Sequence, residues 1–524
     1  MLKFCSRFLK FTLIIIFSFL TVSSLLVTQS CFSPDADELS NVPVYKLHDN
    51  ILLHLAAILI FCVIIYLLRA LTDKKAFVKG LLAKSRPFYR IAAAVLAFLI
   101  SYLILSDGSR TPYGDQAQVY GAAMYFNTGN YINLSPGGYL DMYPHQLGYV
   151  AFLQLLFKIT GSTSFFMVQV INCLFIAGIV FAACLLIESL TDSTVVQLLG
   201  TLYVLTLLPL YIHASLLYGD IPSMLFSLLF INHFIKGLRS RQPKYLLLSV
   251  PELVLAVLFK KNSIILLIAA AIILMIHIII TRRRLLIILL LALCITPFGS
   301  LRLINTYYSN ISGYTVTGGI PSSAWIAMGM LEEGSPGWFN NYPVPAYYEA
   351  EYDRRKASEM AIEKIKERFN YFREDPIYAL SFWKRKISTQ WNDPFFHSYD
   401  IIFTDEEETH GLTAFIIEHS GEIMTALSIF QNITYSGVLL YLIFRRSTDS
   451  NTVMSASYDT DKNIREHGLY MLLPELCILG GFLFSILWEA NSRFILPYYI
   501  IMLPLACIGW NNLISKIRAS LVVS

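Results

Sequence analysis

The chain has 524 residues, of which 56% are hydrophobic and only 15% are charged. A soluble globular domain carries about 25% charged residues, so this composition excludes an ordinary soluble protein. Many windows of about 20 apolar residues lack charge, which predicts an all-α polytopic membrane protein. The net charge of +4 decides little by itself, because the placement of the basic residues matters more.

The first 30 residues permit two interpretations. Three basic residues, Lys3, Arg7 and Lys10, precede the apolar run "FTLIIIFSFLTVSSLLV". This order fits a signal peptide as well as a first membrane span. Because the following "TQSC" is a poor lipoprotein cleavage site, we expect an uncleaved first span.

Twelve apolar segments predict about twelve transmembrane helices. The expected spans are 11–29, 51–69, 91–106, 164–187, 194–217, 221–237, 245–259, 264–280, 285–303, 423–444, 469–488 and 495–513. The segment at 245–259 is the weakest, because it is short and contains Pro251 and Glu252. It either crosses together with 264–280 or forms a re-entrant hairpin with it, and the number of crossings stays even in both cases.

Cysteine and histidine give no sign of a metal centre. The eight cysteines are scattered, lie mostly in apolar runs and form no CxxC pair, which is typical of small apolar residues in helices. The ten histidines form no cluster. We therefore predict no bound metal ion and no cofactor.

The basic residues predict the side of the membrane on which each loop lies, since they concentrate in short cytoplasmic loops. The 70–90 loop holds six basic residues against one acidic residue, and further basic groups stand at 238–244, 281–284, 445–446 and 516–518. With twelve spans, all of these groups fall on one side. This predicts that both termini lie in the cytoplasm.

The same orientation gathers the unusual polar groups on the outer side. The long loops at 107–163 and 304–422 lie there, as do the junctions "LLYGDIP", "FKKNS" and "LWEANSRF". The chain then divides into three parts: an N-terminal transmembrane module (1–303), an extracytoplasmic helical region (304–422) and C-terminal transmembrane helices (423–524).

The first outer loop carries two helix signals. "TPYGD" predicts a helix start with Asp115 as a possible N-cap, and apolar residues from Val119 to Phe126 then recur at helical spacing. "HQLGYVAFLQLLFKITG" is apolar but short, which predicts an interfacial or half-inserted helix.

The second outer loop predicts two further helices. The first is charged and has Ala361, Ile362, Ile365 and Phe369 on one face, and the second starts after Pro376.

An Asp just past a span, a "YPHQLG" motif later in the same loop and an interfacial helix after it resemble the GT-C glycosyltransferases. Protein O-mannosyltransferases and bacterial aminoarabinose lipid A transferases are particularly similar. "LYGDIP", "FWKRKISTQWNDP" and "WEANSRFILPYY" match as well. The chain departs from these families at three points. Gln116 follows Asp115, whereas the families usually have Glu after this Asp, and Tyr143-Pro144-His145 replaces Lys-Pro-Pro or His-Pro-Pro. The large C-terminal soluble domain of the families is also missing here.

The resemblance implies a GT-C-like bundle in a plasma membrane, with extracytoplasmic interfacial helices and a polyprenyl-phosphate-linked sugar as donor. The sugar would pass, with inversion, to a cell-envelope polymer, a lipid or a protein, and no nucleic acid is involved. Such a reaction needs a carboxylate that takes the proton of the acceptor hydroxyl. It also needs cations that hold the leaving phosphate at the surface of the bilayer.

The residues expected to do this chemistry are Asp115 and Asp220 as catalytic groups; Arg493, Lys260, Lys261 and His145 on the donor phosphate; and Asp141, Tyr143, Gln116, Glu332 and Glu489 on the substrates. Each has a structural alternative. Asp115 and Asp220 can cap helices, the lysines can snorkel at span ends, and Arg493 can pair with Glu489.

Three other functions remain open. A transporter of twelve helices fits the number of spans, but the two halves show no duplication and the polar groups cluster at the outer boundary. A polysaccharide polymerase or ligase would use the same lipid-linked substrates. A non-catalytic accessory protein is kept open by Gln116 and the altered "YPHQ" motif.

Overall fold

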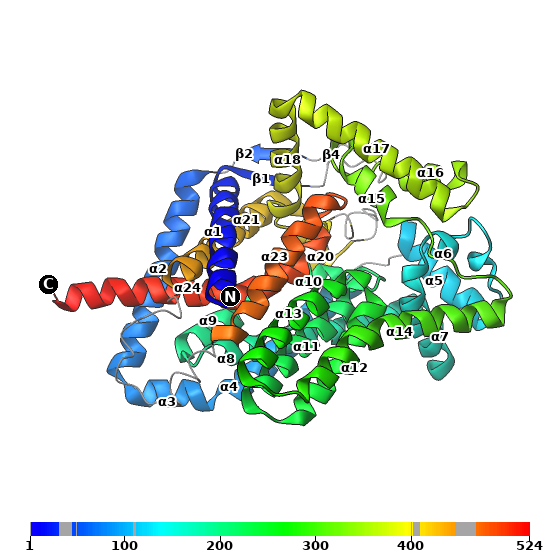
Figure 1. Ribbon diagram of the computed structural model, residues 1–524. Coiled ribbons are helices and arrows are strands. Elements are labelled where there is room, and N and C mark those ends of the chain that lie inside the picture. Colours follow the sequence, from blue (N-terminus) through cyan, green and yellow to red (C-terminus); the bar gives the residue numbers. More distant parts are fainter. Residues whose placement is uncertain are drawn as a thin grey trace.

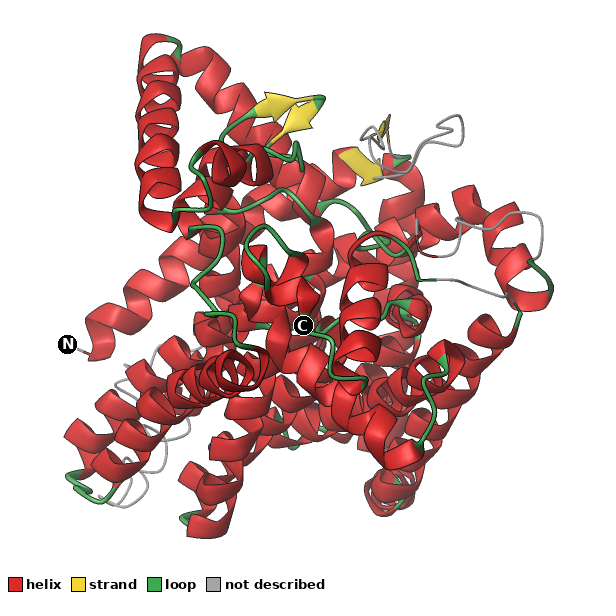
Figure 2. Cartoon of the chain, turned by 90° about the vertical axis from the view of Figure 1, so that its right-hand side faces the viewer, coloured by secondary structure: helices red, strands yellow, loops and turns green. Residues whose placement is uncertain are grey.

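The computed structural model describes residues 2–30, 45–48, 50–107, 112–399, 401, 409–445 and 468–523. Helices make up nearly all of it (Figure 2). Two short antiparallel ribbons stand beside them: β1 (Val27–Ser30) pairs with β2 (Tyr45–His48), and β3 (Glu332–Glu333) with β4 (Ser335–Pro336). The prediction of an all-α protein is confirmed.

Ten helices in the described residues are long and apolar enough to cross a membrane, with an eleventh if one bent pair counts as a span. The ten lie in α1 (Leu2–Leu26), α2 (Ile51–Lys74), α4 (Arg86–Ser106), α8 (Phe165–Leu190), α11 (Asp220–Ser240), α13 (Ile264–Thr281), α14 (Leu286–Ser312), α21 (Ser420–Phe444), α23 (Leu472–Leu487) and α24 (Leu496–Val523). The prediction of a polytopic membrane protein is confirmed.

The expected twelve spans differ from these helices at two segments. The segment predicted at 245–259 forms α12 (Pro243–Phe259), whose 17 residues span ~26 Å and fall short of a ~30 Å hydrocarbon core. The segment predicted at 194–217 breaks into α9 (Thr194–Leu205) and α10 (Leu208–Ile212), which form the bent pair at 49°. Pro209 lies in the first turn of α10, where it starts a new helix instead of continuing the old one.

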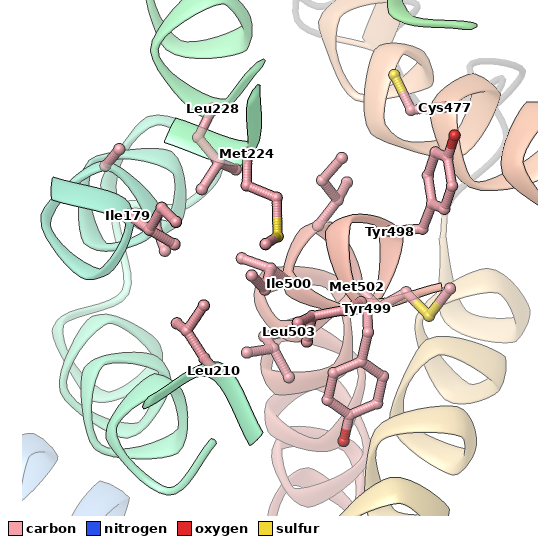
Figure 3. Packing of buried hydrophobic residues seen from close by; sticks show 14 of the residues in the cluster. Ile179, Leu210, Met224, Leu228, Cys477, Tyr498, Tyr499, Ile500, Met502 and Leu503 are labelled. Carbon is pink, nitrogen blue, oxygen red and sulfur yellow. The ribbon is translucent and has the colours of Figure 1, made fainter. Parts of the chain in front are cut away.

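The hydrophobic core extends through the bundle, and one part of it lies between α8, α10, α11 and α24. Ile179, Leu210 and Met224 from the first three helices point toward Ile500 and Leu503 of α24 (Figure 3). Lipid tails are as apolar as these side chains, so close packing contributes more to helix association here than removal from water does.

Helices α21 and α24 approach most closely at two glycines. A Cβ atom on Gly509 would lie 1.9 Å from the carbonyl oxygen of Gly437. A Cβ atom on Gly437 would lie 2.8 Å from Cα of Ala506. Small residues at such a contact let two membrane helices pack backbone against backbone.

We expect Gly509→Ala to destabilise the protein by about 1–3 kcal/mol, because the added methyl group forces α21 and α24 apart. Thermal unfolding in detergent measures the effect. Gly421→Ala is the matched control, since no atom lies within 4 Å of a Cβ there. Equal losses for the two variants would contradict the close approach.

The region after α14 forms a layer at one end of the bundle. It contains α15 (Ser322–Gly329), α16 (Pro343–Glu349), α17 (Arg354–Glu374) and α18 (Pro376–Trp391). Helix α20 (Gly411–Glu418) follows later in the chain and packs against α4 and α21. In Figure 1, α17 and α18 lie at the top, whereas α3 (Ala76–Lys84), in the basic 70–90 loop, lies at the bottom. The basic loop and this layer therefore occupy opposite ends of the molecule.

The second outer loop forms its two helices at the predicted positions, but the predicted apolar face of the first is only half covered, by Ala361 and Ile365. Helix α17 buries Ala357, Ala361 and Phe372, while Phe369 is 68% exposed and Ile362 is 42% exposed. The face is set by contact with α15, which the helical spacing alone does not reveal.

Candidate functional site

A cavity of about 850 Å³ lies where this layer meets the ends of the bundle helices. Asp115, Tyr143 and His145 of the first outer loop line it, together with Lys260, Lys261, Glu489 and Arg493. Segments that lie far apart in the sequence thus bring acidic and basic side chains together in one cavity. Trp325, Trp338 and Arg354 of the outer layer complete the wall.

The cavity side chains stand at the starts of helices. A single 3-10 turn precedes each of α7 (Leu147–Thr160), α13 and α24, and these turns are Pro144–Gln146, Lys261–Ser263 and Ser492–Phe494. They carry His145, Lys261 and Arg493. Because the first N–H groups of a helix lack internal partners and carry partial positive charge, several helix starts at one cavity favour a bound anion.

Asp115 lies in the first turn of α5 (Gly114–Asn127) and does not cap it. Tyr113 occupies the N-cap position, and no side chain caps the helix. The carboxylate is instead exposed in the cavity, where it accepts a hydrogen bond from the hydroxyl of Tyr218 at 3.4 Å. The N-cap prediction was therefore wrong, and the carboxylate is accessible to a substrate.

Asp220 is buried at the start of α11 and is held by two cations. Its Oδ2 lies 2.9 Å from Nζ of Lys260, and its Oδ1 lies 3.9 Å from Nε of Arg493. Gly219 occupies the N-cap position of α11, so Asp220 does not cap this helix either. Asp220 does not line the large cavity but fixes two side chains that do.

The alternative partner expected for Arg493 was Glu489, and this pairing is not formed. Glu489 accepts a hydrogen bond from Nδ2 of Asn491 at 3.2 Å, and burial raises the pKa of its carboxyl group. Burial opposes the charge of Arg493, yet the carboxylate of Asp220 raises the pKa of the guanidinium overall. Arg493 is therefore a permanent cation directed at the cavity.

Burial affects the charge of two residues that were expected to contact the phosphate, His145 and Lys260. Burial lowers the pKa of His145 to about 3, with Lys260 and Lys261 adding to the shift. His145 is therefore neutral near pH 7 and can offer a phosphate only one N–H. Burial also lowers the pKa of Lys260, and Asp220 offsets part of that shift.

Three residues expected to bind substrate lie outside the cavity. Asp141, in α6 (Tyr139–Met142), accepts from the backbone N–H of Gly137 at 3.0 Å and from Thr317 at 3.2 Å. Gln116 accepts from the backbone N–H of Leu217 at 2.8 Å. Glu332 accepts from Tyr378 and Arg385, both at 2.6 Å. In the structure, these side chains form hydrogen bonds that hold neighbouring segments together. Their contact with substrate stays a prediction.

Several residues of the cavity wall were not expected from the sequence. Tyr218 and Trp488 stand in the quoted junctions "LLYGDIP" and "LWEANSRF" but were not singled out. Trp325 stacks on Trp488 with ring centroids 6.1 Å apart, and Tyr143 lies 6.0 Å from Trp325. The tryptophans of the second outer loop were the signal that could have indicated this wall.

The ion pair between Lys260 and Asp220 predicts a stability effect. We expect Lys260→Met to lower stability by about 3–5 kcal/mol, because it leaves a buried carboxylate without its nearest cation. The double variant Lys260→Met/Asp220→Asn removes both charges and should recover most of the loss in thermal unfolding.

Lys261→Met is the control for that comparison, because the described residues supply no ion pair for Lys261. A Lys260→Met protein that melts at the same temperature as the Lys261→Met protein would contradict the pairing.

The long apolar helices are those of a multi-pass membrane protein, and a family-model match over part of the chain supports a membrane glycosyltransferase of the GT-C type. Residues 145–300 match the family described as dolichyl-phosphate-mannose-protein mannosyltransferase, which is a GT-C family. The GT-C resemblance inferred from the sequence is thereby confirmed. The matched segment contains His145, Asp220, Lys260 and Lys261, whereas Asp115 and Arg493 lie outside it. A search of curated proteins gave no match.

Proposed function

We propose that this protein transfers a sugar from a polyprenyl-phosphate donor to an acceptor hydroxyl at the extracytoplasmic face of the membrane. The observation that carries the proposal is the joint presence of an accessible carboxylate, Asp115, and three cations, Lys260, Lys261 and Arg493, in one cavity. The acceptor is a cell-envelope polymer, a lipid or a protein.

The proposed reaction is a single displacement. The acceptor oxygen forms a bond to the anomeric carbon of the sugar while the bond from that carbon to the phosphate oxygen breaks, which inverts the configuration. Asp115 takes the proton of the acceptor hydroxyl as general base. The electron pair of the broken bond leaves with polyprenyl phosphate, a stable anion, so no general acid is needed.

The cations would hold the leaving phosphate. Arg493 can offer its N–H groups to two phosphate oxygens, and the lysines add compact positive charge. These groups act at the oxygens where negative charge develops in the transition state, which is where fixed positive charge lowers the barrier most.

The wall of the cavity also suits a lipid carrier. Ile264 and Ile265 of α13, Phe298 and Leu301 of α14, and Phe484 of α23 contribute apolar side chains to it. A polyprenyl tail would lie along these bundle helices while its phosphate reaches the polar end of the cavity.

The side of the membrane is proposed from the charge distribution. Lys261 precedes α13 at the cavity, and the basic residues at 281–284 follow the same helix ~27 Å away. Since short basic loops stay in the cytoplasm, this supports a cavity on the extracytoplasmic side and both termini in the cytoplasm. The division at 303 and 422 into two membrane modules and an outer region remains part of this proposal.

The test is to incubate the purified protein in lipid nanodiscs with labelled polyprenyl-phosphate sugars and with candidate acceptors. The proposal expects at least one donor to lose its label to an acceptor and to leave polyprenyl phosphate. If the protein is reconstituted in proteoliposomes and the labelled sugar crosses their membrane unchanged, the result would support a transporter instead. Transfer of a whole glycan from a pyrophosphate carrier would support a polymerase or ligase, and no reaction with any donor would support an accessory role.

A further inference from the structure

Tyr218 stands between the proposed base and the proposed phosphate cations. It lies in the short link before α11, is only 6% exposed, and lines the cavity. Its hydroxyl donates to Oδ2 of Asp115 at 3.4 Å, and the amide nitrogen of Gln146 donates to its phenol oxygen. A phenol has a single proton to donate, so the contact with Gln146 leaves that proton for Asp115.

The ring of the same residue touches the cations. Nζ of Lys260 lies 4.9 Å from the ring centroid, and the guanidinium carbon of Arg493 lies 5.2 Å from it. Both distances are within the range of cation–π attraction. The ring of Tyr218 therefore contacts both cations, and its hydroxyl contacts the carboxylate of Asp115.

The backbone holds Tyr218 at this position. A Cβ atom on the neighbouring Gly219 would lie 1.9 Å from the carbonyl oxygen of Phe259, the residue before Lys260. A Cβ atom on Gly148 would lie 2.1 Å from the carbonyl oxygen of Leu258. The segments that carry Tyr218, Lys260 and Gln146 are thus pressed together with no room for side chains at these two glycines.

The phenol also keeps its proton near neutral pH. Burial and the nearby carboxylate of Asp115 hold the pKa of Tyr218 well above its usual value. Its hydroxyl therefore stays protonated near neutral pH and can donate to Asp115.

We propose that Tyr218 is a positioning residue with two separable roles: its hydroxyl orients the carboxylate of Asp115, and its ring sets the spacing of Lys260 and Arg493 around the donor phosphate. This inference rests on the proposed transferase function. It assigns the alignment of base and phosphate to one side chain that the family resemblance does not single out.

Two substitutions separate the roles. Tyr218→Phe keeps the ring and removes the hydroxyl, so kcat should fall about 10- to 100-fold while KM for the donor stays within about twofold, as expected for a misaligned base. Tyr218→Leu removes the ring as well, so it should raise KM for the donor and weaken the binding of polyprenyl phosphate. A merely structural role would move kcat and KM together with thermal stability.

Tyr149→Phe is the matched control. Tyr149 is fully buried in α7, packs against Phe152 and Phe259, and does not line the cavity. This variant removes a buried phenol hydroxyl near the site and should leave kcat and KM unchanged.

The outcomes distinguish the inference from the proposed function. A Tyr218→Phe protein with wild-type kcat overturns the role of the hydroxyl, and a Tyr218→Leu protein that binds polyprenyl phosphate like wild type overturns the role of the ring. If the wild-type protein transfers sugar from no polyprenyl-phosphate donor, the proposed function fails. The binding of polyprenyl phosphate to the two variants then decides the role of the ring by itself.

Discussion

Replacement of Asp115 by Asn is expected to reduce sugar transfer by about 10³-fold, which is within the range that general base catalysis contributes. The amide is nearly the same size as the carboxylate but cannot take the proton of the acceptor hydroxyl. Since Asp115 is exposed in the cavity and pairs with no cation in the described residues, its loss should leave the fold and the binding of polyprenyl phosphate unchanged.

The rate of transfer and the affinity for polyprenyl phosphate are measured on the same preparation. Glu363→Gln, which neutralises an exposed carboxylate on α17, is the control and should transfer at the wild-type rate. Asp220→Asn offers a second contrast, because Asp220 holds Lys260 and Arg493 and its loss should weaken donor binding. An Asp115→Asn protein that folds and transfers sugar at the wild-type rate would rule out the base role.

Replacement of Arg493 by Met is expected to weaken the binding of the donor and of polyprenyl phosphate by about 10- to 100-fold. The loss corresponds to a hydrogen bond to a charged group, worth about 1.5–3 kcal/mol. Met keeps much of the length of the side chain and removes only the cation. The affinity of Arg493→Lys for polyprenyl phosphate should fall between those of the wild type and of Arg493→Met. Lys keeps the positive charge but cannot offer two parallel N–H groups to one phosphate.

Arg355→Met is the control for this experiment. Arg355 is 87% exposed on α17 and pairs only with the nearby Glu359 among the described residues. Binding is measured by titration with polyprenyl phosphate in nanodiscs at fixed ionic strength. Unchanged affinity in Arg493→Met would exclude a phosphate contact at this residue.

The sequence predicted the membrane class, and it singled out several of the residues that line the cavity, such as Asp115, Lys260 and Arg493. Long apolar segments decide the class because a membrane leaves few alternatives to a helix. Charged residues at span ends, such as Lys260 and Arg493, are costly unless they are paired or functional, which singled them out. The GT-C motifs then indicated the chemistry that such residues share.

The details that the sequence did not reveal depend on local backbone geometry and on contacts between distant segments. Asp115 resembles an N-cap in the sequence, but Tyr113 takes that position. Asp141 and Glu332 look available in their loops, yet Thr317 and Arg385, distant in sequence, donate to them. Tyr218 could not be singled out, because a tyrosine in an apolar junction is usually packing, and its two roles depend on segments that meet only in the fold.

The most direct measurement of the central claim is to locate the donor in the protein. A polyprenyl-phosphate sugar with a photoreactive group near the phosphate is cross-linked to the wild-type protein in nanodiscs, and the labelled peptides are identified by mass spectrometry. We expect labelled residues in all three segments, 143–146, 259–265 and 484–494, and loss of the label when unmodified polyprenyl phosphate competes. Labels confined to surfaces outside these segments, or insensitive to the competitor, would contradict the account.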